Sequence, residues 1–465
     1  MTTALLDALH AVLPGGVDVD DVARESASTD RSGTRADGIP DAVVHPRNTA
    51  EVQAVCRIAS EFRVPIVPRG AGTGLAGGAV AGRGQIVLCT DRMTEIVEIS
   101  IDNQLAVVQP GILNGDLNRV LAEHGLWWPP DPASKEISTV GGNIAMNAGG
   151  LLCAKYGVTR EAVLALTVVL ADGDVITVGH RTVKGVTGLD LCALMIGSEG
   201  TLGIITECTL KVRPLITGLV PTIGGYFGTA TEAAQAASAV MAAGQRPAIM
   251  ELMDHNMLRA VSDYSGEDLA GGGGAFLLVQ TDGPNAESEA ADIAAILRQH
   301  GARSLQVTSD PDAVQSLVDV RRSGFLAIEA RGTILVEDVS VPRDRIADMF
   351  VHIDEVAERY GLFIATPCHA GDGNLHPTFV LDPGLRDVPE SVWEAAGEIF
   401  EFALAIGGTL SGEHGIGLLK RRWLRDELGD RQLNLQRGIK ELFDPEGLLN
   451  PGKVFPALSA DGAYV

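Results

Sequence analysis

Short runs of Val and Ile alternate with glycine-rich turns through the first half of the chain. Such apolar runs, bounded by Gly and Pro, predict strands at 64–68, 84–90, 105–111, 165–178 and 203–214. Helical periodicity is confined to shorter stretches, which predict helices at 4–13, 49–62 and 114–124. Strands and loops therefore dominate the predicted first domain, residues 1–214.

The pattern changes after Pro214, where alanine-rich segments with helical spacing alternate with apolar strands. It predicts helices at 231–243, 286–300, 342–359 and 390–406, and strands at 275–283, 333–341 and 362–370. Such an alternation is typical of helices packed on a sheet, so residues 215–415 are predicted to form an α+β domain. A last helical stretch at 416–443 and a Pro- and Gly-containing tail form a third segment, 416–465.

Composition fits a globular protein without an integral membrane segment. The 465 residues are 46% hydrophobic and 21% charged, and no run of eighteen apolar residues occurs. The first residues carry no Lys or Arg before their apolar positions, unlike a signal peptide, so the expected location is the cytoplasm. The formal charge of -24 repels phosphate backbones, which makes nucleic acid an unsuitable partner.

The six cysteines are scattered along the chain. None forms a CxxC pair, and their spacing suits neither a zinc ribbon nor an iron–sulfur cluster. We expect reduced thiols that pack mostly as small apolar side chains.

Three glycine-rich segments lie in the first domain. The first, PRGAGTGLAGG at 68–78, contains GxGxxG at Gly72, Gly74 and Gly77 directly after a predicted strand. A Rossmann loop must open a helix, and the few residues before the next strand at 84 leave no room for one. The Rossmann interpretation is therefore rejected. Together with the segments 138–150 and 197–206, this loop indicates an extended cofactor whose diphosphate is held by backbone N–H groups.

Histidines flank a tight turn in CHAGDGNLHP, residues 368–377. The Gly-Asp-Gly-Asn turn can direct His369 and His376 toward one point, and Glu413 and His414 lie between glycines in a later loop. Two imidazoles and a carboxylate form an open set of three ligands for a divalent ion, and they suit Zn, Mn or Fe equally. Cys368 precedes His369 on the predicted strand, so we expect it to face the opposite side.

These segments together resemble the vanillyl-alcohol oxidase superfamily. The resemblance rests on PRGAGTGLAGG, PDPASKEISTVGGNIAMNAGG (130–150) and GSEGTLGIIT (197–206) in the first half. In the second half, EDVSVPRDRI (337–346), HAGDGNLHP (369–377), SGEHGIGLLKR (411–421) and NPGKVF (450–455) resemble its 2-hydroxy-acid dehydrogenases. The branch that looks nearest contains the FAD subunit of glycolate oxidase and D-lactate dehydrogenase. The resemblance implies a two-part FAD-binding domain, an α+β substrate domain and a C-terminal segment that returns to the flavin.

The resemblance also implies which residues contact FAD. The first loop would wrap the pyrophosphate, the second segment would line the flavin and its phosphates, the third would hold the adenosine side, and the tail would reach the ring. In order, these residues are Arg69, Gly70, Ala71, Gly72, Thr73, Gly74 and Leu75; Pro132, Ala133, Ser134, Thr139, Gly142, Asn143, Asn147 and Gly149; Glu199, Gly200, Gly203 and Ile205; and Asn450. The three glycine segments contain no His or Cys, so the FAD is expected to be non-covalent.

Catalytic roles follow from the same resemblance. His369, His376 and Glu413 match the ligands of a divalent metal, and His414 matches a general base. Asn374 would form a hydrogen bond with the substrate, and Asp372 would support a ligand from behind. The expected reaction oxidises a 2-hydroxy acid to the 2-oxo acid by hydride transfer to FAD, while His414 takes the hydroxyl proton.

Arg321 matches the arginine that binds the substrate carboxylate, and Arg322 is the better candidate for a surface position. The chain departs from the family pattern at Val318, where relatives often have Trp. It departs again at Val336, where 2-hydroxyglutarate dehydrogenases tend to have Lys. Without that second cation, small monocarboxylates such as glycolate or D-lactate are the expected substrates.

Several alternatives stay open at this stage. The chain could be a D-2-hydroxyglutarate dehydrogenase, a true oxidase or a transferase of the same fold, or a non-catalytic flavin subunit of an electron-transfer complex. A dehydrogenase without iron–sulfur cysteines must pass its electrons to an iron–sulfur subunit, a cytochrome or a quinone. Such a partner could hold the protein at a membrane surface. The oligomeric state is open, with a homodimer as one option.

Overall fold

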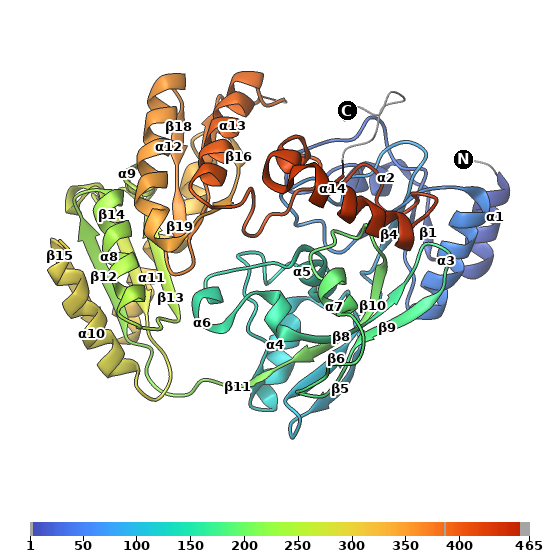
Figure 1. Ribbon diagram of the computed structural model, residues 1–465, viewed down its shortest axis with the longest axis horizontal. Coiled ribbons are helices and arrows are strands. Elements are labelled where there is room, and N and C mark those ends of the chain that lie inside the picture. The colour runs from blue at the N-terminus through green and yellow to red at the C-terminus, as the bar shows by residue number, and fades with distance from the viewer. Residues whose placement is uncertain (1–2, 386, 456–465) are drawn as a thin grey trace. The chain divides into compact units, whose positions relative to one another are not determined.

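The computed structural model describes residues 3–385 and 387–455 (Figure 1). The chain divides into two units. Unit 1 comprises Met1–Gly149, Gly157–Leu215 and Glu413–Val465, and unit 2 comprises Gly150–Tyr156 and Ile216–Gly412. The domain boundaries expected from the sequence lie at 214/215 and 415/416, and the unit boundaries of the structure lie at 215/216 and 412/413. In addition, the short segment 150–156 belongs to unit 2.

Unit 1 begins with a small sheet in the order β1-β2-β4-β3. Strands β2, β4 and β3 are parallel, and β1 runs antiparallel to β2. The helices α2 and α3 beside this sheet carry side-chain caps: Asp20 accepts from Ala23 N at the start of α2, and Asn48 accepts from Glu51 N at the start of α3. The elements are α1 (Thr3–Val12), β1 (Val17–Asp18), α2 (Asp21–Ala27), β2 (Ala42–Val44), α3 (Thr49–Phe62), β3 (Ile66–Arg69) and β4 (Ile86–Cys89).

The second part of unit 1 is an antiparallel sheet in the order β5-β6-β10-β8-β9, with a short pair β11-β7. Its apolar faces form a core with α4, α5 and α7, in which Trp128 is fully buried. The elements are β5 (Ile96–Ser100), β6 (Leu105–Val108), α4 (Asn114–Glu123), β7 (Leu126–Trp127), α5 (Val140–Met146), η1 (Thr159–Ala162), β8 (Val163–Val169), β9 (Val175–Gly179), α7 (Leu191–Met195), β10 (Ile204–Lys211) and β11 (Arg213–Pro214).

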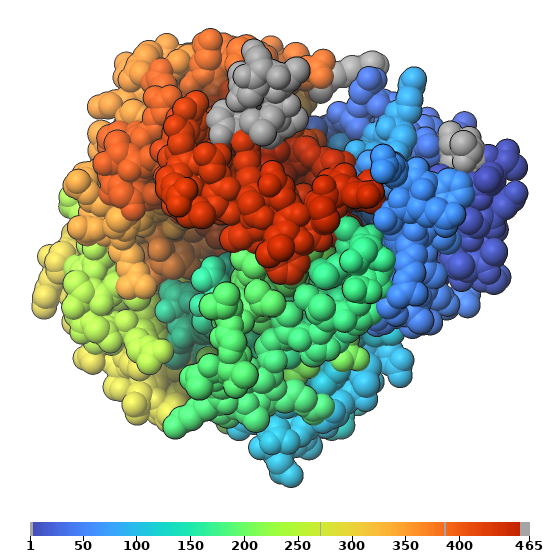
Figure 2. Space-filling model, turned by 45° about the vertical axis from the view of Figure 1, so that its right-hand side comes forward, coloured from blue at the N-terminus to red at the C-terminus, as the bar shows by residue number. Residues whose placement is uncertain are grey.

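The C-terminal segment packs on this antiparallel part of unit 1. After η4 (Arg421–Trp423), helix α14 (Leu424–Phe443) places Ile439 and Phe443 against the core. The Lys440 ammonium donates to the backbone carbonyls of Thr201 and Leu449 at 2.7 and 2.8 Å. Figure 2 shows this red segment lying against the green residues of the same unit. The tail is thereby fixed beside the third glycine segment.

Unit 2 contains an antiparallel sheet in the order β15-β12-β14-β13-β19-β20-β17 and a smaller antiparallel sheet β16-β21-β18. The strands are β12 (Thr222–Phe227), β13 (Ile249–Met253), β14 (Ala275–Gln280), β15 (Ser304–Thr308), β16 (Thr333–Val336), β17 (Val339–Ser340), β18 (Phe363–Ala365), β19 (Pro367–His369), β20 (Asn374–Leu375) and β21 (Thr378–Leu381). The hairpin β19-β20 carries the two candidate metal-ligating histidines: His369 ends β19, and His376 follows β20 directly.

The helices of unit 2 cover its sheets. Figure 1 shows these helices around the strands of unit 2, and α9 and α11 pack with strand residues such as Phe276 in one core. Asp254 and Asp310 cap α9 and α11 by accepting backbone N–H bonds. The helices are α6 (Cys153–Tyr156), α8 (Ala230–Ala242), α9 (His255–Ser265), η2 (Ala270–Gly272), α10 (Ala286–Gln299), α11 (Pro311–Glu329), η3 (Arg343–Arg345), α12 (Ile346–Tyr360) and α13 (Glu390–Ala405).

The structure differs from the sequence-based elements in several places. Helix α14 begins at Leu424 and not at 416, because residues 416–420 form turns that contact other loops of unit 1. The runs 165–178 and 333–341 each divide into two strands. The glycine segment 138–150 contains the short helix α5, and the helices α9 and α11 were not expected. None of the helices in residues 3–385 and 387–455 combines the length and apolar character needed to span a bilayer.

Candidate active site

The first glycine loop follows β3 directly and leads to β4 without a helix, since residues 70–85 contain only turns, bends and irregular backbone. The rejection of a Rossmann motif is thereby confirmed. The loop lies against the second glycine segment: a Cβ at Gly70 would approach Thr139 Oγ1 to 2.3 Å. Only a residue without a side chain allows this contact, so the two segments form one surface of backbone.

Arg69 supports the first loop from inside. Its Nη1 donates to the carbonyls of Thr29 and Ala79 at 2.9 and 3.1 Å. A Cβ at Gly72, where φ is +69°, would lie 2.2 Å from Arg69 Nη2. The guanidinium therefore orders the backbone of the loop, and a direct role in holding a pyrophosphate stays a prediction.

The second segment forms the start of α5. The Thr139 hydroxyl accepts a hydrogen bond from Gly142 N at 3.2 Å, which caps the helix. Asn147 ends the helix in the left-handed conformation, and its Oδ1 accepts from Arg160 N at 3.0 Å. Before the helix, residues 132–138 form consecutive turns, in which Ser134 O accepts from Ser138 N at 2.8 Å.

The third glycine segment, residues 197–206, packs against β3 and the antiparallel sheet of unit 1. A Cβ at Gly200 would approach Pro68 to 3.2 Å, which places this segment beside β3. Gly203 packs against Val168, and Ile205 belongs to the hydrophobic core of the antiparallel sheet. These two contacts give Gly203 and Ile205 structural roles, while their predicted contact with adenosine is not tested.

Glu199 joins the third segment to the loop that follows Glu413 and His414. Its carboxylate accepts the backbone N–H bonds of Ile416 and Gly417 at 2.7 and 2.8 Å. Burial raises the pKa of Glu199 to about 7, although both N–H bonds act in the opposite direction. The side chain that we expected near adenosine therefore positions the loop of the candidate base.

The same loop also contacts the first glycine segment. Leu418 N donates to Ala76 O at 2.8 Å, and a Cβ at Gly417 would lie 2.0 Å from that oxygen. Asn450, in the left-handed region, donates from Nδ2 to Gly78 O at 2.9 Å and to Glu199 O at 2.7 Å. All three glycine segments, the tail and the loop 413–418 thus meet within unit 1.

This part of unit 1 fits a bound polar cofactor. Among the described residues, no hydrogen-bond partner is found for the buried atoms Asn143 Nδ2, Asn450 Oδ1 and Ser138 Oγ. Buried polar atoms are rarely left unsatisfied, and a ligand is one common explanation. Because these atoms lie on the glycine segments and the tail, FAD fits the surface that these segments form.

Glu413 and His414 begin the last part of unit 1. A Cβ at Gly149 would lie 2.4 Å from Glu413 Oε1, so the carboxylate lies directly on the backbone at the end of the second glycine segment. His414 follows, half-buried, and the Glu199 contacts fix the backbone two residues later. On the other side of Glu413, Gly412 N donates to Asp338 at 2.8 Å within unit 2.

The histidine hairpin lies in unit 2. His369 ends β19 and pairs in register with Asn374 of β20, and His376 N donates to Pro367 O at 2.9 Å. Gly373 turns the chain with φ +95°, and a Cβ there would lie 2.1 Å from Val341 O. The two imidazole rings are buried, with centroids 5.0 Å apart in a T-shaped arrangement. The turn therefore brings both rings together, as the sequence predicts.

Glu251 on β13 is the residue that the sequence analysis missed. It is only 1% exposed, and its Oε1 lies 2.6 Å from His369 Nδ1. Its other oxygen accepts from Arg321 Nε at 2.9 Å, and Arg321 Nη2 is also 2.9 Å away. One buried carboxylate thus orients both a candidate metal ligand and the candidate substrate-binding arginine. The available signal was a lone charge within the apolar run IMELM, 118 residues before His369.

This arrangement fits a metal ligand set. Glu251 accepts a hydrogen bond from Nδ1 of His369, so Nδ1 carries the proton and Nε2 is the nitrogen that would bind an ion. Metal-binding histidines commonly have such an acceptor on their other ring nitrogen. Asn374 Oδ1 is buried without a hydrogen-bond partner among the described residues, and Asn374 Nδ2 lies 3.5 Å from His376 Nε2. The Oδ1 of Asp372 accepts from Asn374 N at 3.3 Å, and the expected support of a metal ligand by Asp372 stays a prediction. Glu251 contacts His369 directly. Cys368 is fully buried, as expected.

Comparisons with known proteins identify both halves of the chain. Residues 220–454 match the family "FAD linked oxidases, C-terminal domain", and residues 40–179 match an "FAD binding domain". The glycolate oxidase subunit GlcD of Bacillus subtilis is 43% identical over 90% of this chain and 89% of its own length. The D-lactate dehydrogenase of Anaerostipes hadrus is 35% identical over 98% of each chain.

Solved structures agree on the fold. A 4-ethylphenol oxidase from Gulosibacter chungangensis superposes with a TM-score of 0.77 at 17% identity, covering 97% of this chain and 96% of its own. A p-cresol methylhydroxylase gives a TM-score of 0.77 at 18% identity, covering 98% and 97%. The expected two-domain FAD-binding fold of the vanillyl-alcohol oxidase type is confirmed. The chain belongs to the FAD-linked oxidases and carries both the FAD-binding domain and the C-terminal domain of that family.

Proposed function

We propose that this flavoprotein oxidises a small 2-hydroxy acid, glycolate or D-lactate, to the 2-oxo acid with the help of a divalent metal. The observation that carries the proposal is the pair of contacts made by Glu251, which orients His369 and Arg321 from one buried position. An ion ligand and a carboxylate-binding cation side by side suit a substrate that has a hydroxyl next to a carboxylate. Relatives named glycolate oxidase subunit and D-lactate dehydrogenase support the same substrate class.

Arg321 would bind the substrate carboxylate. Glu251 occupies its Nε and Nη2, and Nη1 makes no hydrogen bond to another described residue. The guanidinium is therefore held in one orientation while it can still donate to an anion. Arg322 is exposed and takes no part in this pairing.

His414 would accept the hydroxyl proton of the substrate. The imidazole has a reference pKa of about 6.5, which suits a base near neutral pH. Its backbone position is fixed by the Glu199 bonds to Ile416 and Gly417, in the same unit as the FAD-binding segments. Asn374 would form a hydrogen bond to the substrate from the histidine hairpin.

Two bound groups would supply the remaining chemistry. FAD, held non-covalently on the glycine segments of unit 1, supplies the hydride acceptor when bound. A divalent ion held by His369, His376 and Glu413 supplies a Lewis acid that lowers the pKa of the substrate hydroxyl. The electrons would leave through a partner protein or a quinone, since the described cysteines are single thiols and mostly buried.

Steady-state reduction of an artificial electron-accepting dye tests the proposal. We expect turnover with glycolate or D-lactate, loss of turnover with a chelator, and recovery when Zn, Mn or Fe is returned. His369→Ala should abolish this turnover, whereas His300→Ala, on the exposed end of α10, should keep it. Absence of turnover with every small 2-hydroxy acid would refute the substrate class. Turnover that resists the chelator would refute the role of the metal.

A further inference from the structure

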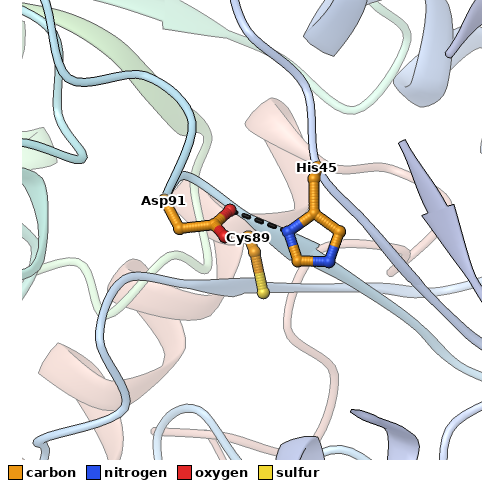
Figure 3. A group of neighbouring side chains, drawn as sticks. All are labelled: His45, Cys89 and Asp91. Atoms are coloured by element: carbon orange, nitrogen blue, oxygen red, sulfur yellow. Dashed lines mark hydrogen bonds and ion pairs between the residues drawn. The ribbon is translucent and has the colours of Figure 1, made fainter. Parts of the chain in front are cut away.

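A second group of metal-binding residue types lies in unit 1, at the carboxyl ends of β2 and β4. His45 follows β2 directly, Cys89 is the last residue of β4, and Asp91 comes two residues later. The two strands are parallel and paired from Ala42↔Ile86 to Val44↔Leu88. Since the carboxyl ends of parallel strands lie at the same edge, the three side chains converge there, as Figure 3 shows.

The three side chains are close enough to share one ion. One ligand atom from each of His45, Cys89 and Asp91 lies within 4.8 Å of the others. The ligands of tetrahedral zinc lie about 2.0–2.3 Å from the metal, so neighbouring ligand atoms are about 3.3–3.8 Å apart. Adjustments of roughly an ångström would suffice. Among the described residues, Cys89 is the cysteine that groups with histidine and carboxylate donors in this way.

Exposure also suits an ion that enters from solvent. Asp91 is 53% exposed, the His45 side chain is 14% exposed, and Cys89 is 8% exposed. A carboxylate thus faces the water while the thiol and the imidazole lie behind it. Cys89 is a free cysteine and makes no hydrogen bond with a described residue, so packing in the small core beside Val43 and Val87 is its present role.

A fourth group lies on the far side of the imidazole. His45 Nδ1 is 2.8 Å from Asp91 Oδ1, and His45 Nε2 is 3.2 Å from Asp18 Oδ2 on β1. Both carboxylates lie within ion-pair distance of the ring, and the hydrogen bond with Asp91 is the main reason that the pKa of His45 is raised. An ion bound through Nδ1 would replace the Asp91 hydrogen bond and leave the contact with Asp18 on Nε2. That is the ligand and carboxylate arrangement typical of zinc-bound histidines.

We propose that His45, Cys89 and Asp91 bind a divalent transition ion of the zinc class, with water as the fourth ligand. The donor set of one nitrogen, one sulfur and one oxygen is a mixed set that zinc accepts. Burial raises the pKa of the Cys89 thiol to about 12, so the ion must displace the thiol proton to solvent when it binds. The bound ion would join the ends of β2 and β4 and, through Asp18, the edge strand β1. It would stabilise unit 1 and takes no part in the reaction proposed above.

Zinc binding to the full-length flavoprotein tests this site. The double variant His369→Ala/His376→Ala removes two proposed ligands of the catalytic ion, so that a remaining zinc reports the new site. We expect one zinc per chain after gel filtration, measured by mass spectrometry. X-ray absorption should show one sulfur neighbour at about 2.3 Å, which the ligands His369, His376 and Glu413 cannot supply.

Cys89→Ser is the decisive variant, and Cys153→Ser is the matched control because Cys153 lies on α6 of unit 2. In the double-variant background, Cys89→Ser should remove the sulfur signal and lower zinc affinity by about tenfold or more, whereas Cys153→Ser should change neither. Loss of zinc from the double variant, or zinc surrounded by nitrogen and oxygen alone, would overturn the proposal. If these variants fail to fold, X-ray absorption of the wild-type protein loaded with zinc tests the same site. A sulfur neighbour at about 2.3 Å from zinc supports the proposal, and the absence of a sulfur neighbour refutes it.

Asp91→Asn separates the metal site from a plain ion pair. With either role the variant loses the ionic contact with His45 and melts at a lower temperature in the absence of zinc. The proposal also expects that zinc raises the melting temperature of the wild type and that Asp91→Asn reduces this shift. An unchanged zinc-induced shift in Asp91→Asn would show that His45 and Asp91 form only an ion pair.

Discussion

Removal of the Glu251 carboxylate should damage both the stability of unit 2 and its affinity for a metal ion. Glu251 is buried and contacts His369 Nδ1 at 2.6 Å and Arg321 Nε at 2.9 Å. Glu251→Ala leaves the guanidinium charge and the imidazole N–H without their acceptor. Removing one partner of a buried ion pair costs about 3–5 kcal/mol, because the other charge stays buried.

That free energy converts to a large change in melting temperature. For a unit of roughly 200 residues, 1 kcal/mol corresponds to about 2–4 °C, so Glu251→Ala should lower the melting of unit 2 by about 6–20 °C. Glu251→Gln retains one acceptor oxygen and should cost less, about 1–3 kcal/mol. Differential scanning calorimetry measures both variants. Glu329→Gln, exposed at the end of α11, serves as the control with no expected change.

Metal affinity gives the second measurement on the same proteins. Residues that support a metal-bound histidine typically contribute 10- to 100-fold to affinity, and we expect a loss of that order in Glu251→Gln. Calorimetric titration of the apoprotein measures it without turnover. If Glu251→Ala melts within 1–2 °C of the wild type, roughly the change for less than 1 kcal/mol, the carboxylate does not hold Arg321 and His369 in place. If its stability falls while the metal affinity of Glu251→Gln is unchanged, Glu251 supports the fold and does not position the ligand.

Three further variants test the other parts of the site. His414→Ala should lower kcat by about 10²- to 10⁴-fold with FAD content unchanged, and an unchanged kcat would remove the base assignment. Arg321→Lys should raise KM for the 2-hydroxy acid, because a lysine cannot donate to the substrate carboxylate and to Glu251 with the same geometry; an unchanged KM would contradict this role. The pKa of Glu199 is raised by burial to about 7, so its stabilising contribution is present below its reference value of 4.5 and is lost as pH rises through 7. Melting curves should therefore show that Glu199→Gln is less destabilising at pH 8 than at pH 5, and equal shifts at both pH values would contradict the raised pKa.

Local pattern was enough to predict much of the fold. The helical spacing of apolar residues predicted both ends of α3, and the run AFLLVQ predicted β14. Helix α5 was missed because two glycines near its start made the segment read as a loop, whereas the Thr139 cap and burial of Ile144 stabilise it. The predicted start of α14 was too early for a similar reason: the apolar residues of 416–419 pack in turns against the first glycine loop.

In the candidate site, too, the sequence predicted contacts between residues that are close along the chain and missed contacts between distant ones. The Gly-Asp-Gly-Asn turn at 371–374 predicted that His369 and His376 lie together, because adjacent strands of a hairpin keep a fixed register. The partner of His369 could not be predicted in this way, since Glu251 lies 118 residues earlier and pairs through the sheet. Glu199 contacts Ile416 over 217 residues, and no local pattern indicates that contact. Side chains that position a site are therefore the part that only the folded structure reveals.

Anaerobic reduction of the bound flavin tests the central claim most directly, because it requires neither a partner nor an electron acceptor. The protein is mixed with glycolate, D-lactate, L-lactate or D-2-hydroxyglutarate, and the flavin absorbance is followed in a stopped-flow instrument. We predict rapid bleaching by glycolate or D-lactate, slow or no bleaching by D-2-hydroxyglutarate, and loss of bleaching after chelation. A flavin that stays oxidised with every one of these acids would contradict the account.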